Sequence, residues 1–392
     1  MNMEQLENGI GQFGTPLYVF NTDELVNCVK NFREMLGEKV GLCYAMKANP
    51  FLTGQMEAIV DKIEVCSMGE FRICRALGLP PEKILVSGVL KKKEDILEIL
   101  DYCRGKCSYT AESLNQYQYF ADWSDANHEM LQIYPRLTSG NQFGMDKGTI
   151  QKIIESRHLH PFLNIQGIHY FSGTQKKKIG KVLDELAYLD TFLLELELKT
   201  GFRIEKLEYG PGLSVPYFEG QADIRQEDIK TLADAICNMQ WKGSIMLEMG
   251  RAFVADCGYF LTKVKDIKQN DGINYCIVDG GIHQMNYDGQ IRGMYHPIFR
   301  VSPKNKCEDY KEWTVCGALC TTNDVLMQKV PLKDLNIGDV LIFERVGAYS
   351  MTEGMALFLS HALPKVALYN NETGWKLIRK DQPTYKWNME GI

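Results

Sequence analysis

The sequence lacks the marks of a structural zinc site, of a membrane protein and of a general nucleic-acid binder. None of its twelve cysteines forms a Cys-x-x-Cys pair. No histidine lies near the closer pairs Cys103/Cys107 and Cys316/Cys320, so no metal site is expected. No apolar run approaches the roughly 20 residues that a membrane span needs. A formal net charge of −6 argues against general binding to nucleic acid or to a membrane surface.

The start of the chain also lacks a targeting signal. Glu4, Glu7 and several polar residues interrupt residues 1–14, which therefore contain no apolar core of a signal peptide. Scattered cysteines in a long acidic chain are typical of a reducing compartment, and we expect a cytoplasmic protein with free thiols. With 392 residues, the chain is too long for one ordinary core, so we expect two domains.

Apolar runs alternate with amphipathic patterns over the first two thirds of the chain. Such alternation favours parallel βα units, and eight units close into a (β/α)8 TIM barrel. The runs show no strict polar alternation, as expected for strands covered on both faces. We predict this α/β domain over residues 22–260, with strands at 40–46, 63–66, 84–87, 107–110, 130–136, 164–171, 206–210 and 244–250, and helices at 53–61, 69–76, 92–103, 113–121, 147–156, 176–200 and 226–240.

The rhythm changes from about residue 261, where short strand-like runs follow one another between Gly, Pro, Asn and Asp turns. This pattern predicts a C-terminal β-sandwich or β-barrel domain over residues 261–392, which residues 1–21 are expected to join. The stretch 280–306 is the least regular and is predicted to be a functional loop. The expected strands of this domain are 17–20, 261–267, 275–278, 313–317, 325–330, 340–345, 366–369 and 375–378.

Lys47 follows directly on the uncharged run 40–46, and Asn49-Pro50 then starts a loop. The lysine is therefore expected at the mouth of the barrel. Burial disfavours an ammonium ion, so such a lysine can become the neutral nucleophile that forms a Schiff base. A solvated or ion-paired lysine is the plainer interpretation of this residue taken alone.

Other strand ends carry groups that complement this lysine, and strand ends share one face of a barrel. His169 and Phe171 end one strand, a Gly-Pro-Gly turn follows the next, and Glu248 and Arg251 end the last. Glycine N–H groups and Arg251 suit a phosphate, and Glu248 can keep a pyridine nitrogen protonated. Together with Lys47 they predict a pyridoxal 5'-phosphate (PLP) site and no metal.

Motifs spread over nearly the whole chain resemble those of the fold-type III PLP decarboxylases. This is the group of diaminopimelate and ornithine decarboxylases, with an alanine racemase-like barrel. The resemblance implies a PLP-dependent carboxy-lyase that decarboxylates an amino acid through a Schiff base and a quinonoid intermediate. The motifs are Tyr44-Ala45-Met46-Lys47-Ala48-Asn49, Gly167-Ile168-His169 to Gly173-Thr174-Gln175, Glu208 to Tyr217 around Gly210-Pro211-Gly212, Glu248-Met249-Gly250-Arg251, Cys316 to Asp324, and Gly338-Asp339 with Gly347-Ala348-Tyr349.

The resemblance implies roles residue by residue. Lys47 carries the cofactor, Glu248 contacts the pyridine nitrogen and Cys320 returns a proton; His169 completes the catalytic set. Cys320 is otherwise an ordinary buried thiol. Cofactor binding is implied for Lys47, Phe171, Thr174, Gly210, Gly212, Glu248, Gly250, Arg251 and Tyr349, and substrate binding for Cys320, Thr321, Asp324 and Arg292. Cys320 and Asp324 are implied to enter the partner's site, which makes a homodimer with shared active sites.

Departures from the family pattern bear on the substrate. Phe171 replaces a histidine that stacks on the cofactor ring, and Pro211 replaces a glycine and cannot donate an N–H. Thr321 replaces the acidic residue that binds the distal ammonium group of diamino-acid substrates in the family. Asp288 stands loosely where diaminopimelate enzymes have an arginine, with Arg292 nearby. The chain therefore resembles more closely the branch of siderophore and aminoglycoside biosynthesis, whose members decarboxylate an amino-acid unit on a larger molecule or carrier protein.

Three alternatives stay open: a diaminopimelate decarboxylase of lysine biosynthesis, an amino-acid racemase, and a catalytically silent PLP-binding protein. Release of CO2 separates a decarboxylase from the last two. The lysine runs 91–93 and 176–178 follow strands on the catalytic face. We hypothesise that they attract an anionic substrate or an acidic carrier, the alternative being a solvated charged face.

Overall fold

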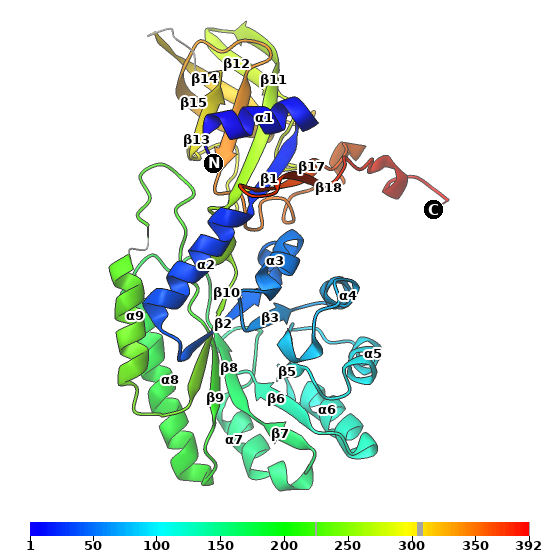
Figure 1. The fold of residues 1–392 in the computed structure, drawn as a ribbon, viewed down its shortest axis with the longest axis vertical. Coiled ribbons are helices and arrows are strands. Elements are labelled where there is room, and N and C mark those ends of the chain that lie inside the picture. The colour runs from blue at the N-terminus through cyan, green and yellow to red at the C-terminus, as the bar shows by residue number, and fades with distance from the viewer. Residues whose placement is uncertain (224–225, 304–308, 392) are drawn as a thin grey trace. The chain divides into compact units, whose positions relative to one another are not determined.

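The computed structural model describes residues 1–223, 226–303 and 309–391, which fall into two compact units (Figure 1). The barrel unit comprises residues 28–215 and 223–253, and the sheet unit comprises residues 1–27, 216–222 and 254–392. The sequence had assigned 216–222 to the barrel. This segment belongs instead to the sheet unit because the rings of Tyr217 and Phe218 pack against Tyr287.

The barrel unit is a parallel sheet with the order β7-β6-β5-β4-β3-β2-β10-β9-β8, as predicted for an α/β barrel. A bridge between Arg136 and His169 joins its two ends, and the N–H of Leu137 donates to the His169 carbonyl at 2.9 Å. The strands are β2 (Val40–Ala45), β3 (Lys62–Val65), β4 (Ile84–Val86), β5 (Ser108–Ala111), β6 (Leu131–Pro135), β7 (Leu163–Ile165), β8 (Gly167–Phe171), β9 (Lys206–Gly210) and β10 (Ser244–Met249).

The expected single strand 164–171 is broken at Gln166. β7 pairs with β6, whereas β8 pairs with β9, so the chain changes partner at the break. Gln166 forms backbone hydrogen bonds with both neighbouring strands. Its N–H donates to the carbonyl of Ile133 in β6, and its carbonyl accepts from the N–H of Lys206 in β9. A Cβ at Gly167 would lie 2.5 Å from the Tyr134 ring, so only glycine fits where the strand crosses over. In effect β7 and β8 together occupy one barrel position.

Helices cover the outside of the barrel (Figure 1). Several helices follow a capping residue whose side chain accepts a hydrogen bond from the backbone N–H three residues later. Ser67, Ser113 and Asp146 are such residues. The helices are α2 (Thr22–Leu36), α3 (Thr53–Glu57), α4 (Met68–Ala76), α5 (Lys93–Cys103), α6 (Leu114–Asn127), α7 (Lys147–Glu155), α8 (Ile179–Thr200), α9 (Gln226–Asn238) and α10 (Arg251–Val254), with 3-10 turns η1 (Met46–Ala48) and η2 (Pro50–Leu52).

The sheet unit is a mixed sheet with the order β15-β14-β12-β11-β1-β17-β18, in which β16 pairs with β11 and β13. The strands are β1 (Leu17–Asn21), β11 (Gly258–Asn270), β12 (Ile273–Val278), β13 (Phe299–Ser302), β14 (Tyr310–Cys316), β15 (Val325–Lys333), β16 (Val340–Glu344), β17 (Lys365–Asn370) and β18 (Gly374–Arg379). Residues 299–302 of the predicted loop 280–306 therefore form a strand, and residues 304–306 of that loop lie outside the described residues.

Helix α1 (Met3–Phe13) precedes the first strand and was not predicted. A capping box between Asn2 and Gln5 starts it, and its residue Leu6 is fully buried in a cluster with Leu17 and Val19. The capping box is visible in the sequence and was the missed signal. It makes α1 one of the elements that cover the core of the sheet unit.

Within the part of the chain that the structure describes, no helix is both long enough and apolar enough to cross a bilayer. The described residues also contain no group of three or more His, Cys, Asp or Glu side chains that could hold a metal ion. None of the eleven described cysteines forms a disulfide bond, and Cys307 lies outside the described residues.

Candidate active site

Lys47 lies on η1, immediately after β2. Its Nζ donates to Glu64 Oε2 at 2.5 Å, and it lies 3.7 Å from Glu248 Oε1 and 3.5 Å from Cys66 Sγ. The Lys47 side chain is 38% exposed, whereas the two carboxylates are almost fully buried. The amine is therefore at the mouth of the barrel, as predicted, and two buried acids hold it in place.

Glu248 connects this amine to His169. Its Oε2 lies 3.0 Å from His169 Nε2, because β10 and β8 direct both side chains into the barrel. Burial alone would raise the pKa of Glu248, but the Lys47 ammonium, the hydrogen bond and charge of His169, and the charge of Arg136 lower this pKa to about 2. Glu248 is therefore ionised at any physiological pH, as a partner for a protonated pyridine nitrogen must be.

A second buried carboxylate, Glu208, behaves in the opposite way. Burial raises its pKa well above the ordinary value, and the nearby charge of Glu248 raises it further. Burial therefore favours the neutral form of Glu208, whereas Glu248 is charged. Neighbouring acids whose pKa values are driven apart in this way are characteristic of sites that handle protons or charged cofactors.

A glycine turn follows β9 and packs tightly against the loop after β8. Gly212 has a φ of +63°, and a Cβ there would lie only 2.0 Å from the Gly173 carbonyl oxygen. The Gly212 carbonyl accepts from the N–H of Lys176 at 2.9 Å. The Ser214 hydroxyl beside this turn is buried and has no hydrogen-bond partner among the described residues. An unpartnered donor beside a glycine cradle fits a phosphate group.

We expect Gly212→Ala to weaken PLP binding at least about tenfold and to lower stability by about 2 kcal/mol or more, because alanine is strained at positive φ and meets the Gly173 carbonyl. Spectroscopic titration of PLP and thermal unfolding measure the two effects. Gly140→Ala is the matched control, since Gly140 also has positive φ, +94°, but nothing lies within 4 Å of its Cβ position. Equal PLP affinity in both variants would contradict the assignment of the cradle.

The remaining predicted cofactor residues of the barrel unit gather at the same strand ends. The Phe171 ring lies against Gly210, where a Cβ would meet it at 2.6 Å. Gly250 follows β10 and faces Ala48 of the lysine turn, with 2.8 Å between the Cβ positions. Arg251 begins α10 and is buried, and Thr174 is exposed in the loop after β8.

The lysine runs 91–93 and 176–178 were expected to be exposed, but the first lysine of each run is not. Lys176 is 9% exposed and pairs with Glu185 at 2.6 Å. Lys91 is buried, and its Nζ donates to the Gly88 carbonyl at 2.7 Å; burial lowers its pKa to about 8. These two lysines shape the loops around them. Only residues 92–93 and 177–178 remain exposed to attract an anion.

The other predicted residues belong to the sheet unit. Cys320 is exposed on the loop between β14 and β15. The Asp324 carboxylate is buried and accepts from the N–H groups of Leu319 at 2.7 Å and Ile282 at 2.9 Å. These contacts of Asp324 hold the Cys320 loop in shape. The role of Asp324 in substrate binding stays a prediction. Arg292 Nε donates to Asn323 in the same loop at 2.8 Å.

The structure thus groups the predicted residues in two sets. Lys47, His169, Phe171, Thr174, Gly210, Gly212, Glu248, Gly250 and Arg251 lie at the barrel strand ends, and Cys320, Thr321, Asp324 and Arg292 lie on adjoining loops of the sheet unit. Tyr349 also belongs to the sheet unit, with a φ of +63°.

Sequence reasoning missed several polar residues of the barrel interior. Glu64 pairs with Lys47, and Arg136 pairs with Glu112 at 2.7 Å with both side chains buried. Glu64 had a readable signal, since it is the only charged residue of the predicted strand 63–66. Buried acids in strands are rare unless they are paired, so this position was a candidate from the start.

The fold and these strand ends define a PLP-dependent decarboxylase, and comparison with known families agrees. The family profile described as "Pyridoxal-dependent decarboxylase, C-terminal sheet domain" matches residues 17–347, so the chain belongs to this family. It is a PLP-dependent carboxy-lyase that acts on an amino acid or an amino-acid conjugate.

Individual relatives have different substrates. The chain is 28% identical over 374 residues to the diaminopimelate decarboxylase of Methanocaldococcus jannaschii, covering 87% of this chain and 83% of the relative. It is 25% identical over 408 residues to the L-glutamyl-[BtrI acyl-carrier protein] decarboxylase of Niallia circulans, covering 97% and 95%. The solved structure of a diaminopimelate decarboxylase from M. jannaschii superposes with a TM-score of 0.86 at 25% identity, covering 98% and 94%.

Proposed function

We propose that this enzyme decarboxylates an amino-acid unit of a larger conjugate, such as a carrier-linked one, as a homodimer that shares its two active sites. Bound PLP supplies an electron sink for the electron pair that remains when the carboxylate leaves as CO2. The chain contributes the groups that hold this cofactor and select the substrate.

The barrel residues divide this work by their chemistry. Lys47 provides the amine that binds the cofactor aldehyde, and Glu64 and Glu248 keep that side chain at the barrel mouth. Glu248 stays ionised and so holds a proton on the pyridine nitrogen. The glycine turn around Gly212 and the guanidinium of Arg251 hold the phosphate.

The choice of substrate rests on the charge of the Cys320 loop. The residue after the cysteine is Thr321, which carries no charge, and the only acid nearby in the loop, Asp324, is occupied by backbone N–H groups. Arg292 adds a cation, held by Asn323. A loop with a cation and no available acid disfavours a substrate with a distal ammonium. The carrier-linked substrate in the name of the Niallia circulans relative supports a conjugate.

The test is a CO2-release assay over meso-diaminopimelate, ornithine, glutamate, glutamyl-pantetheine and glutamate on a carrier protein. We expect the conjugates to exceed the free amino acids at least tenfold in kcat/KM, or about 1.4 kcal/mol. A preference for meso-diaminopimelate would replace the proposal with the second candidate, diaminopimelate decarboxylase, which the match to the Methanocaldococcus jannaschii enzyme favours. Turnover without CO2 would indicate a racemase.

Shared sites predict complementation between two defective variants. Lys47→Ala removes the cofactor lysine, and Cys320→Ala removes the proposed proton donor, which is exposed on its loop. Each variant alone should be nearly inactive. If the two residues of one site come from different subunits, mixed dimers contain one intact site, and random pairing restores about a quarter of wild-type activity.

The control mixes Lys47→Ala with the double variant that lacks both Lys47 and Cys320, where no intact site can form. Activity of the subunit mixtures is measured after partial unfolding and reassociation. Failure of the first mixture to exceed its control, with dimers present, would contradict shared sites.

The proposal places the enzyme in the cytoplasm. Its support is that none of the eleven described cysteines forms a disulfide bond, since thiols stay reduced where the surroundings are reducing. Fractionation of the native host with an antibody against the chain tests the location, and recovery from an oxidising compartment would contradict it.

A further inference from the structure

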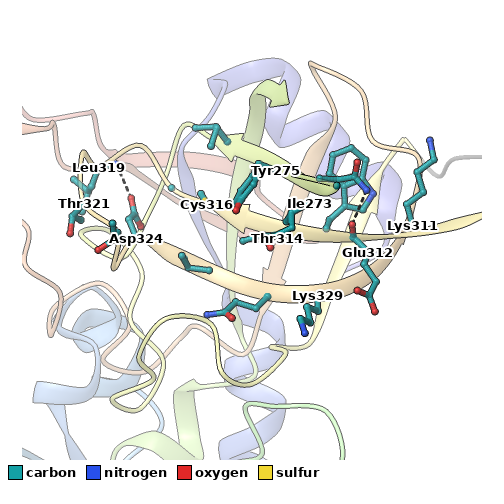
Figure 2. A pocket seen from close by; sticks show the side chains of 18 residues that line it. Ile273, Tyr275, Lys311, Glu312, Thr314, Cys316, Leu319, Thr321, Asp324 and Lys329 are labelled. Carbon is teal, nitrogen blue, oxygen red and sulfur yellow. Dashed lines mark hydrogen bonds between the residues drawn. The ribbon is translucent and has the colours of Figure 1, made fainter. Parts of the chain in front are cut away.

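A large groove lies on the sheet unit, along β12, β14 and β15 (Figure 2). Its volume is about 800 Å³, within the range of sites for small molecules and cofactors. Figure 2 shows Thr321 and Asp324 at one end, and Lys311 and Glu312 at the other. Thr314 on β14 lies between them. The groove therefore runs from the Cys320 loop along the length of β14.

The β12 side chains on this face of the sheet are apolar, whereas β14 contributes polar ones. Trp313 and Val315 of β14 are buried, and Glu312, Thr314 and Cys316, which alternate with them, line the groove. On β12 the outward residues are Ile273, Tyr275 and Ile277, which line the groove. A sheet face in contact with water normally carries polar residues. Three apolar residues in a row therefore indicate that something covers this face.

The charged residues of the groove balance one another. Lys311 and Lys329 are offset by Glu312 and Asp324, and Lys311 is already paired with Asp334 at 2.6 Å. A balanced lining gives no advantage to a compact polyanion. It suits an uncharged occupant with amide groups and methylenes, which can contact both the apolar β12 residues and the polar rim.

We propose that this groove binds the extended amide arm that joins the amino acid to its carrier. The proposal deepens and rests on the proposed function. The seven residues of β14 extend about 20 Å at about 3.3 Å per residue. A pantetheine arm has the length of about five extended residues, roughly 17 Å. The arm lies along β14, and its amino-acid end reaches the loop that presents Cys320.

Direct binding tests the groove without any turnover. Calorimetric titration of pantetheine into the PLP-loaded enzyme should give a measurable Kd, and Thr314→Trp should weaken it at least about tenfold by filling the centre of the groove. Ile273→Trp, at an exposed position of the far end, gives a second variant if the first misfolds. Gln269→Trp on β11, exposed and outside the groove, is the matched control with unchanged Kd.

Substrate comparison gives the second readout. The ratio of kcat/KM for glutamyl-pantetheine to that for glutamate should fall about tenfold in Thr314→Trp and stay unchanged in Gln269→Trp. Absence of pantetheine binding to the wild type, or a Kd in both groove variants equal to that of the wild type, overturns the proposal. Sedimentation that shows monomers only for the groove variants also overturns it, because a second copy of the chain then covers this face. If no substrate releases CO2, the proposed function is contradicted. The titration of pantetheine still tests separately whether the groove binds the amide arm.

Discussion

Replacing Lys47 by alanine is expected to lower CO2 release by about 1,000-fold or more, since no other amine can take its place in covalent catalysis. The visible absorbance of covalently held PLP should disappear at the same time. The groups that contact Lys47 Nζ include the acids Glu64 and Glu248 and the thiol of Cys66, and none of these three can form a Schiff base. An absorption spectrum and a CO2 assay on the purified variant measure both effects.

The control for this experiment is Lys106→Ala, since Lys106 lies on the barrel surface with its side chain 61% exposed. It should keep full absorbance and activity. A Lys47→Ala variant that retained the absorption band would show that another lysine holds the cofactor. That result would contradict the assignment of the cofactor site to the mouth of the barrel.

The barrel could be predicted because its signals are local. Each strand is a short apolar run, and each motif residue follows directly on its strand, so the position of Lys47 or Glu248 at a strand end was readable along the chain. Parallel strands then bring those ends to one face without further information. The position of Gly212 was readable for the same reason, because its turn follows directly on a strand.

What could not be predicted depends on partners far apart in the sequence. Nothing local reveals that Gln166 interrupts a strand, because the break reflects which neighbour each half pairs with. Nothing local reveals that the N–H of Ile282, 42 residues away, donates to Asp324. Lys176 resembles an exposed cation until α8 brings Glu185 to it. In each case a contact with another element, which the local sequence does not show, decides the surroundings of the residue.

Two of the buried carboxylates of the barrel show how one fold favours different charges on similar groups. Glu248 faces Lys47 and His169, whereas at Glu208 burial outweighs the charge of Lys62. Ionisation of both would place two negative charges in one dry interior, at a cost that grows as the local dielectric falls. The barrel interior therefore carries an ionised Glu248, and the charge of Glu248 favours the neutral form of Glu208.

This difference predicts opposite pH dependences for Glu248→Gln and Glu208→Gln. The pKa of Glu248 is lowered from 4.5 to about 2. Its stabilising effect is therefore present above pH 4.5 and is lost as the pH falls toward 2; the full effect is about 3 kcal/mol. Glu248→Gln should be destabilised near pH 7 and should approach the wild type in acid. It should also lower CO2 release about 100-fold, because the pyridine nitrogen loses its anionic partner.

Glu208→Gln is the matched control with the opposite sign. The pKa of Glu208 is raised above its ordinary value, so this group stabilises the fold at low pH and loses that effect as the pH rises and the unfolded chain ionises. Its glutamine variant should therefore gain stability relative to the wild type as the pH rises above about 4.5. Chemical unfolding of the three proteins between pH 3 and 7 measures the free energies. Parallel curves for the two variants would contradict the assignment of one charged and one neutral carboxylate, and with it the role of Glu248 as the anion beneath the cofactor.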